Sequence, residues 1–355
     1  MNSIELMNFI RQSPFKDIIE DQIHHRNNLI GGISTPRDCI SLVIEKNKII
    51  DLLEGIGCDS WDSRKSSYTS LFENVLNNYA VPDCVVNINL SDHPRGGYFN
   101  FCRRKKGNLS HYFNLRPRYL KRLLTSETPW LAPFLLPNYR FTQDNVKLSN
   151  EDFVSETFDD TTQYIQSKHK NFPFNSKISK IYTSSSPHRP KFGYFDYALT
   201  HDFCDGYMWI GHPIYKRCDA SNSFVNRLMK RDLVGGQFMP FMKHIEYKYV
   251  LYNDGTTLSD RMRLLLNLNS VILYKQSNYE EFYTYLLKDR INYIEFSRTS
   301  ELESIYEFLE KTDEGKSLSK NIIENNRNFV TQILNYDNIC QYVAALLNGL
   351  FSKSS

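Results

Sequence analysis

The clearest hydrophobic pattern lies in the last third of the chain, where short apolar runs alternate with amphipathic segments. The apolar runs predict three buried strands, at residues 247–253, 270–275 and 291–296. Helical spacing of apolar residues predicts three helices between and after them, at 259–269, 279–287 and 300–312. Strict alternation of strands and helices predicts right-handed crossovers onto a parallel sheet.

The pattern upstream is less regular. Residues 66–80 have apolar positions at helical spacing, and the β-branched run 83–90 predicts a strand that ends in a polar loop. The first half otherwise favours helices with polar loops. Residues 178–199 predict a strand, a serine-rich loop and a helix, and the tail at 316–351 predicts a long helical segment. The polar stretch 140–175 is the candidate domain boundary.

Composition narrows the class of protein. A chain of 355 residues with 41% hydrophobic residues predicts two globular domains, and a formal net charge of +3 does not indicate nucleic acid. Seven scattered cysteines form no CxxC pair, which argues against a zinc ribbon and fits reduced thiols. The N-terminus lacks a secretory pattern, and no apolar stretch reaches the roughly 20 residues that span a bilayer. We therefore expect a soluble, cytoplasmic protein with at most peripheral membrane contact.

The turn after residues 247–253 carries groups that suit phosphate. Asp254 and Gly255 form a tight turn, and Thr257 and Asp260 have the spacing of a capping box, which predicts a helix from about Leu258. A helix N-terminus attracts anions through its free N–H groups. Further donors to an anion would be Thr256, Thr257, Ser259 and the guanidinium of Arg261. An ordinary capped helix with Arg261 on a solvated face fits the same spacing.

Three other stretches contain candidate site residues. Glu280 or Glu281 would accept hydrogen bonds from a ribose, or would only favour a first helical turn. Asp92 follows a buried strand and suits a general base, although a turn aspartate before Pro94 is equally consistent. The serine-rich loop offers phosphate or sugar donors, namely Ser184, Ser185, Ser186 and Arg189.

Two further signals are weaker. The segment 201–205 holds ligand-type residues without a zinc spacing, and no paired-aspartate motif for a metal–diphosphate site is present in the sequence, so we expect no metal. The basic segment 103–122 suggests RNA or an anionic acceptor, or a solvated face. We favour the anionic acceptor over nucleic acid.

Read together, residues 247–351 resemble the C-terminal half of the glycosyltransferases that include the protein O-glucosyltransferases of the Rumi type. Fungal capsule-associated xylosyltransferases and bacterial lipopolysaccharide-type transferases are in the same family, glycosyltransferase family 90. The resemblance rests on Lys248-Tyr249 before the strand, on the run from Asn253 to Arg261, and on "NSVILYKQSNYEEFY". "INYIEF" stands where the family has a "HYIPV"-like strand.

The N-terminal half is similar over shorter stretches. "VVNINLSDHP" resembles the family strand that ends in the catalytic aspartate, which gives Asp92 the role of base, with His93 in place of an aromatic residue. "IYTSSSPHRPKF" stands where the family has a Gly-Ser-rich loop and an arginine. Here Tyr182-Thr183 replace the usual Arg-Gly, and "KDRINY" lacks the tryptophan of "KPWVHY".

The resemblance implies an α/β protein of GT-B architecture, with two Rossmann-like domains facing a central cleft. We expect an acceptor-side domain at 1–165, a nucleotide-sugar donor domain at 166–335 and a C-terminal helix at 336–355 that packs back across the domains. The implied activity is metal-independent, inverting transfer of glucose or xylose from a UDP-sugar, with no other cofactor. The acceptor would be a hydroxyl of a glycan, a lipopolysaccharide or a protein Ser/Thr, as in polysaccharide biosynthesis. The alternative is a non-catalytic nucleotide- or glycan-binding protein on the same scaffold.

Overall fold

The computed structural model describes residues 8, 10, 13–24, 32–33, 37–90, 99–100, 103–104, 134–135, 158–185, 189–210, 223–237, 239–255 and 259–351. Contacts within the chain define two compact units, which are described separately below. Unit 1 consists of Met1–Gln143, Asn278–Tyr285 and Leu334–Ser355, and unit 2 consists of Asp144–Ser277 and Leu286–Ile333. The predicted division at residues 165 and 335 stays a prediction.

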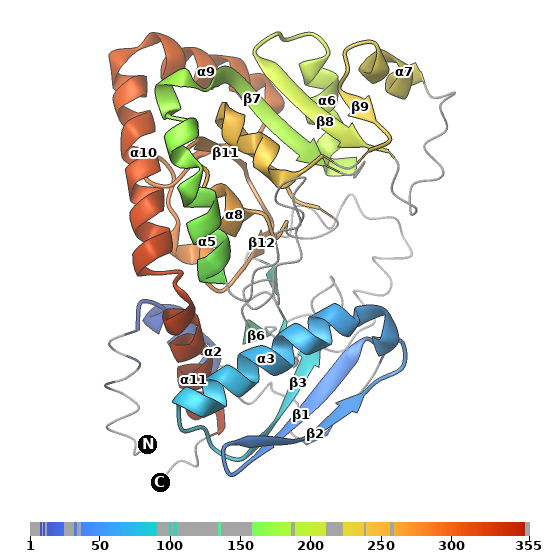
Figure 1. The fold of residues 1–355 in the computed structure, drawn as a ribbon, viewed down its shortest axis with the longest axis vertical. Helices are drawn as coiled ribbons and strands as arrows, with labels where there is room; N and C mark the ends of the chain where they lie inside the picture. Colours follow the sequence, from blue (N-terminus) through green and yellow to red (C-terminus); the bar gives the residue numbers. More distant parts are fainter. Residues whose placement is uncertain are drawn as a thin grey trace. The chain divides into compact units, whose positions relative to one another are not determined.

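Unit 2 is built on a six-stranded parallel sheet (Figure 1). Its strands are β7 (Ile178–Ser185), β8 (Cys204–Trp209), β9 (Val234–Gly235), β10 (Tyr247–Tyr252), β11 (Val271–Lys275) and β13 (Ile294–Phe296). The α-helices of this unit are α5 (Phe158–Ser167), α6 (Arg189–Ala198), α7 (Ser223–Met229), α8 (Met262–Leu265), α9 (Leu302–Lys311) and α10 (Asp313–Gln332). The predicted α/β class and parallel sheet are confirmed in this unit.

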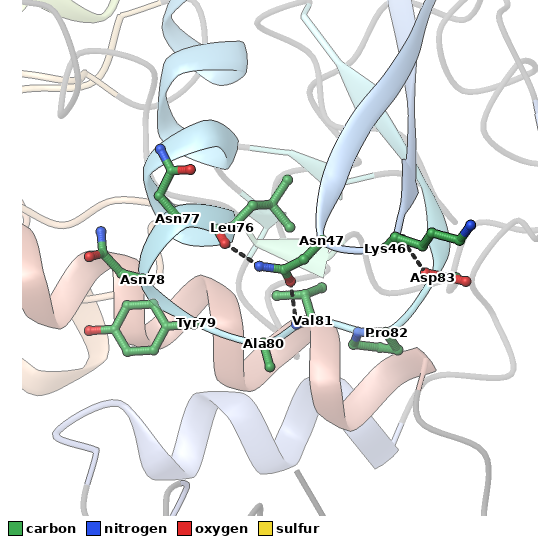
Figure 2. Close-up of a pocket in the computed structure, with 10 residues that line it drawn as sticks. All are labelled: Lys46, Asn47, Leu76, Asn77, Asn78, Tyr79, Ala80, Val81, Pro82 and Asp83. Atoms are coloured by element: carbon green, nitrogen blue, oxygen red, sulfur yellow. Dashed lines mark hydrogen bonds between the residues drawn. The ribbon is translucent and has the colours of Figure 1, made fainter.

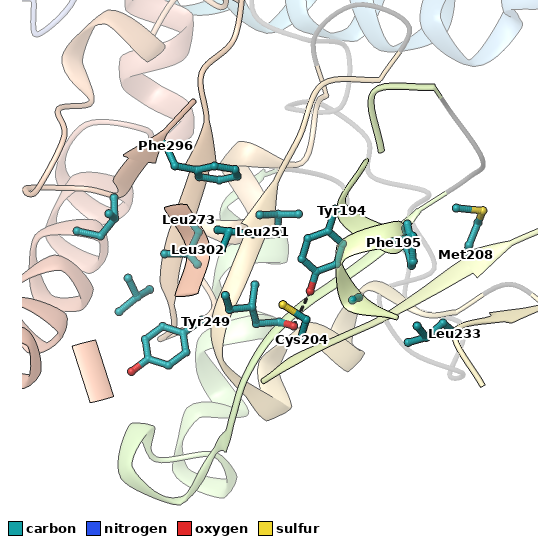
Figure 3. Packing of buried hydrophobic residues seen from close by; sticks show 14 of the residues in the cluster. Tyr194, Phe195, Cys204, Met208, Leu233, Tyr249, Leu251, Leu273, Phe296 and Leu302 are labelled. Carbon is teal, nitrogen blue, oxygen red and sulfur yellow. Dashed lines mark hydrogen bonds between the residues drawn. The ribbon is translucent and has the colours of Figure 1, made fainter. Parts of the chain in front are cut away.

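One hydrophobic cluster of unit 2 forms on one face of this sheet. Alternate strand residues such as Leu251 and Leu273 are fully buried there, as the two-residue period of a strand requires. Aromatic and aliphatic side chains of α6, α7, α9 and α10 complete the cluster, with Tyr194 and Phe195 at its centre (Figure 3). The Tyr194 hydroxyl donates to the carbonyl oxygens of Ile181 and Asp205, which ties α6 to β7 and β8.

The strand order of this sheet is β13-β11-β10-β7-β8-β9. Counted from β7 along the chain, this is the order 3-2-1-4-5-6 of dinucleotide-binding folds. The chain proceeds from β7 outward to β9, then returns to the other side of β7 with β10. The carboxyl ends of β7 and β10 therefore flank the point where the direction of winding reverses, which is where such sheets bind ligands.

Unit 1 contains a mixed sheet in the order β2-β1-β3-β4-β6, together with a short β12–β5 pair. Its strands are β1 (Cys39–Glu45), β2 (Lys48–Glu54), β3 (Cys84–Asn89), β4 (Phe99–Asn100), β5 (Arg103–Arg104), β6 (Phe134–Leu135) and β12 (Tyr279–Glu280). Its α-helices are α2 (Lys16–His24), α3 (Asp62–Asn78) and α11 (Tyr336–Phe351). The predicted strand at 83–90 and helix at 66–80 are confirmed as β3 and α3.

The β1–β2 hairpin corrects the expectation that the first half is mainly helical. Its strands pair antiparallel around Lys46 and Asn47, whose φ angles of 49° and 61° both lie in the left-handed region. Two positive φ angles define the tight turn that suits the twist of a hairpin. Asn47 adopts this conformation more readily than most residues, and its side chain bonds Leu76 and Val81.

Three predicted helices differ in the structure. The predicted helix at 279–287 is wrong: β12 occupies its start and a 3-10 helix, Thr284–Leu286, its end. The helix expected from about Leu258 covers only Met262–Leu265 among the described residues there. The long tail is two helices, α10 and α11, because α10 ends at Gln332 and α11 begins at Tyr336.

Candidate functional site

The carboxyl ends of β7 and β10 separate at Ser184. The last registered pair between the two strands is Tyr182 with Val250. The Ile181 N–H is directed toward β8. Successive residues of a strand direct their N–H and C=O groups to opposite sides, so those of Ser184 are directed toward β10. Side chains bond both of these groups: the Ser184 N–H donates to His244 Nε2 at 3.3 Å, and Arg261 Nη1 donates to the Ser184 carbonyl oxygen. Side chains thus replace the strand ladder where the two strand ends diverge.

Arg261 is the centre of this arrangement. Its Nε donates to Ser259 Oγ at 3.2 Å, while its buried Nη2 atom has no hydrogen-bond partner among the described residues. No described carboxylate lies within ion-pair distance of this guanidinium. Burial lowers the pKa of Arg261, and the charge of nearby Asp260 acts in the opposite direction. An arginine remains charged in proteins, so a buried cation with a spare donor favours an anionic ligand.

Three polar side chains extend the site along the two strand ends. Thr183 and Asn253 are each 1% exposed, and Ser185 is half-buried. The atoms Thr183 Oγ1, Ser185 Oγ and Asn253 Oδ1 are buried and have no hydrogen-bond partner among the described residues. Ser185 is the last residue of β7, Thr183 lies two residues before it, and Asn253 directly follows β10. Buried polar atoms are nearly always bonded, so this row is ready for a polar ligand or water.

Sequence reasoning named Ser185 as a site residue but missed Thr183 and Asn253. The available signal was the abrupt change from apolar to polar residues at the end of each strand, "IYTSS" and "VLYND". A fully buried threonine or asparagine is indistinguishable from an ordinary strand-end residue in the sequence alone. Its unsatisfied oxygen becomes visible only once the neighbouring atoms are placed.

Asp254 follows β10 and is held by the next strand end. Ser277 Oγ lies 2.8 and 2.9 Å from the two Asp254 carboxylate oxygens and donates to them, which joins the ends of β10 and β11. An ionised carboxylate only accepts hydrogen bonds and repels phosphate. Within a predicted donor site, Asp254 is therefore suited to a sugar or ribose hydroxyl rather than to the diphosphate. Gly255 is half-buried directly beside it.

The remaining predicted residues lie elsewhere or outside the described ranges. Glu280 belongs to unit 1, where its backbone pairs with Arg103 across β12 and β5. Arg189 is the first residue of α6, which follows β7. The base Asp92 and the hydroxyl residues Thr256 and Thr257 lie outside the described residues, as does Ser186.

The helix N-terminus that was expected to bind an anion is not supported. Helix α8 has four residues, and Arg261 occupies its N-cap position. A single turn does not build a substantial helix dipole. The anion-binding capacity seen in the described part of this turn therefore comes from the Arg261 side chain, assisted by Ser259.

A pocket lies in unit 1 at the end of the β1–β2 hairpin (Figure 2). Its polar groups already have structural partners. Asn47 Nδ2 donates to the Leu76 carbonyl, the Val81 N–H donates to Asn47 Oδ1 at 2.9 Å, and the Lys46 N–H donates to Asp83 Oδ1 at 2.7 Å. These bonds tie the hairpin turn to the end of α3, so we assign this pocket a structural role.

Two searches of the described residues have negative results. No group of three His, Cys, Asp or Glu side chains in the described part of the chain has the arrangement of a metal site. Within the same ranges, no helix combines the length and apolarity needed to cross a membrane.

Comparisons with known proteins find similarity to a family model and to solved structures. A sheet wound in this order, with anion-seeking groups at its switch point, is typical of nucleotide-binding α/β proteins. The model for glycosyl transferase family 90 matches residues 216–353, so the resemblance drawn from the sequence is confirmed over this segment. The segment includes β10, Asp254 and Arg261.

Among solved structures, Anabaena HepE in complex with UDP-glucose is similar to this chain at 10% identity and a TM-score of 0.36. The alignment covers 51% of this chain and 51% of HepE, so the chain spans about half the length of that protein. A search of curated proteins gives no match.

Proposed function

We propose that this protein is an inverting glycosyltransferase that transfers a sugar from a UDP-sugar to an acceptor hydroxyl. The observation that carries the proposal is the buried guanidinium of Arg261, with its spare Nη2 donor, at the switch point of the unit 2 sheet. The match of residues 216–353 to glycosyl transferase family 90 supports the reaction class. We further propose the GT-B arrangement of two Rossmann-like domains.

In the proposed reaction the acceptor hydroxyl attacks the anomeric carbon as the bond from that carbon to the diphosphate breaks. Asp92, by its resemblance to the family base, removes the hydroxyl proton. UDP leaves with additional negative charge on its terminal phosphate. Arg261 stabilises that charge with hydrogen-bond donors in a buried setting, where such bonds are stronger than in water.

Other residues have proposed supporting roles. Ser185 and Ser259 donate hydroxyls toward the phosphates, Arg189 and the residues following Gly255 complete the anion contacts, and Asp254 accepts from a sugar hydroxyl. Glu280 remains the proposed ribose contact. We propose glucose or xylose as the sugar, a glycan, lipopolysaccharide or protein hydroxyl as the acceptor, and a metal-independent reaction.

The test is UDP release by the purified protein with a panel of UDP-sugars, alongside UDP binding by calorimetry. We expect slow hydrolysis of one donor and its loss in Arg261→Ala, which would name the sugar. Asp92→Asn is expected to bind UDP like wild type and to lose transfer. Binding of UDP without turnover on any donor and acceptor pair would favour a non-catalytic protein, and absence of both would refute the proposal.

A further inference from the structure

We propose that His244 is a positioning residue of the donor site, whose neutral imidazole holds the Ser184 peptide so that Arg261 faces the diphosphate. The inference rests on the proposed function and deepens it. His244 lies in the 3-10 helix Phe241–Glu246, directly before β10, and is fully buried. No family motif drew attention to it.

Contacts with three described residues hold the imidazole in place. His244 Nδ1 lies 2.7 Å from the Phe241 carbonyl oxygen, and Nε2 accepts from the Ser184 N–H at 3.3 Å. The ring stacks on Phe241 with centroids 4.9 Å apart and meets Tyr182 edge-on at 5.0 Å. Rings on two sides and hydrogen bonds at both nitrogens leave this side chain little freedom.

These contacts also determine the protonation of the ring. A carbonyl oxygen only accepts, so Nδ1 carries the proton, and Nε2 must be unprotonated to accept from the Ser184 N–H. His244 is therefore neutral in this arrangement. A proton on Nε2 would face the Ser184 N–H with a second donor and break the bond.

The Ser184 peptide links His244 to Arg261. Its N–H is bonded by His244 and its carbonyl oxygen by Arg261 Nη1, so the two side chains hold one residue from adjacent backbone groups. With Nη1 and Nε both engaged, the rigid guanidinium plane is oriented and the direction of Nη2 is set. Release of the Ser184 N–H loosens the carbonyl that anchors Nη1, and the orientation of Nη2 with it.

A matched pair of substitutions separates this role from simple packing. In His244→Gln the amide lies near the former Nε2 and its oxygen can accept from Ser184. In His244→Asn the shorter amide lies near the former Nδ1, where it donates to Phe241 and does not reach Ser184. Both variants lose the ring, and each keeps one of its two hydrogen bonds. Weaker UDP binding in His244→Asn, which keeps the bond to Phe241, therefore reports loss of the Ser184 bond.

The probes are UDP and uridine, each titrated by calorimetry into both variants and wild type. We expect His244→Asn to weaken UDP binding about tenfold relative to His244→Gln, which is about 1.4 kcal/mol. Uridine lacks the phosphates and is expected to bind both variants alike. Equal UDP affinities in two folded variants, or parallel losses for UDP and uridine, would overturn the proposal.

A second measurement does not depend on any ligand. The ¹⁵N spectrum of wild-type His244 is expected to show a protonated Nδ1 and an unprotonated Nε2, and the Ser184 amide is expected to resist hydrogen exchange in wild type and His244→Gln but not in His244→Asn. If wild type binds no UDP, both the proposed function and the positioning role are refuted. Hydrogen exchange at the Ser184 amide would still test the bond between His244 and Ser184. The opposite tautomer refutes the inference alone.

Discussion

Replacing Arg261 by glutamine tests whether its guanidinium serves a ligand or the fold. The glutamine amide keeps polar character near Ser259 and the Ser184 carbonyl but removes the charge and the spare Nη2 donor. A hydrogen bond to a charged group is worth about 1.5–3 kcal/mol, so loss of one phosphate contact weakens UDP binding about 10- to 100-fold. The same change removes an unfavourable buried charge. The free energy of unfolding of the ligand-free protein is therefore expected to stay the same.

The two effects are measured together by denaturant unfolding with and without UDP. At UDP equal to 100 times the wild-type dissociation constant, binding stabilises wild type by about 2.7 kcal/mol. A variant that binds about 30-fold more weakly gains only about 0.9 kcal/mol at the same concentration, from the same linkage relation. The free energy of unfolding thus separates the two proteins only when UDP is present.

Arg231→Gln is the matched control, because it removes an equal charge from an exposed ion pair. Arg231 lies 3.0 Å from Asp202, and the two side chains are 42% and 94% exposed. Such pairs contribute about 0–1 kcal/mol, so neither stability nor UDP binding should change much. Two results would show that the guanidinium is structural. One is a wild-type affinity for UDP in Arg261→Gln. The other is a decrease above about 2 kcal/mol in the free energy of unfolding without UDP, which is the scale of a broken buried network.

Three further predictions concern stability. The Glu310 carboxylate accepts from Lys248 Nζ at 2.9 Å and from Tyr249 OH at 2.7 Å. Burial raises the pKa of Glu310, but the bonds from Tyr249 and Lys248 and the charge of Lys248 outweigh this and lower the pKa below 4.5. Its stabilisation is therefore present above pH 4.5 and lost as the pH falls through the lower folded value, so Glu310→Gln should flatten the acid part of a stability–pH curve, and an unchanged slope would refute this. Asn47→Ala should lower the free energy of unfolding by about 2 kcal/mol more than Asn47→Gly does, because alanine disfavours the positive φ at this position. Equal urea midpoints for the two variants would contradict the importance of this φ angle. Gly315→Ala should lower the melting temperature because its Cβ would lie 2.1 Å from the Phe308 carbonyl oxygen. Gly193→Ala has open space around its Cβ and should raise the melting temperature slightly. A higher melting temperature for Gly315→Ala than for Gly193→Ala would contradict this packing.

Strands β10, β11 and β13 of unit 2 could be predicted from sequence because each is a short, largely apolar run, whereas β8 alternates buried and half-buried residues and was not predicted. Helices were less predictable where contacts with distant segments determine the local backbone conformation. The segment 279–287 has helical spacing, yet Tyr279 and Glu280 pair with β5, and a partner more than 170 residues away leaves no local signal. The β1–β2 hairpin was missed because its turn, Lys46-Asn47, lacks the glycine that usually marks such turns.

The site divides in the same way. Arg261, Ser259 and Asp254 could be named as candidates from the sequence because they follow one strand within a few residues and resemble a family motif. The bonds of His244 and Arg261 to Ser184 join residues 60 and 77 positions apart, so no local sequence pattern predicts them. The buried, unbonded oxygens of Thr183 and Asn253 likewise depend on which atoms surround them in the fold.

The interleaved composition of the two units has a consequence for how the chain folds during synthesis. Helix α11 supplies side chains such as Val343 and Leu346 that are fully buried and pack in unit 1 against α2 and α3. Segments of unit 1 lie on both sides of unit 2 in the sequence, and α11 follows Ile333, the last residue of unit 2. The core of unit 1 therefore needs α11 as well as the segments before residue 143, and fragments cut at Gln143 or Leu334 would leave that core open. Until α11 has been added, a partner that binds exposed apolar surface would bind unit 1.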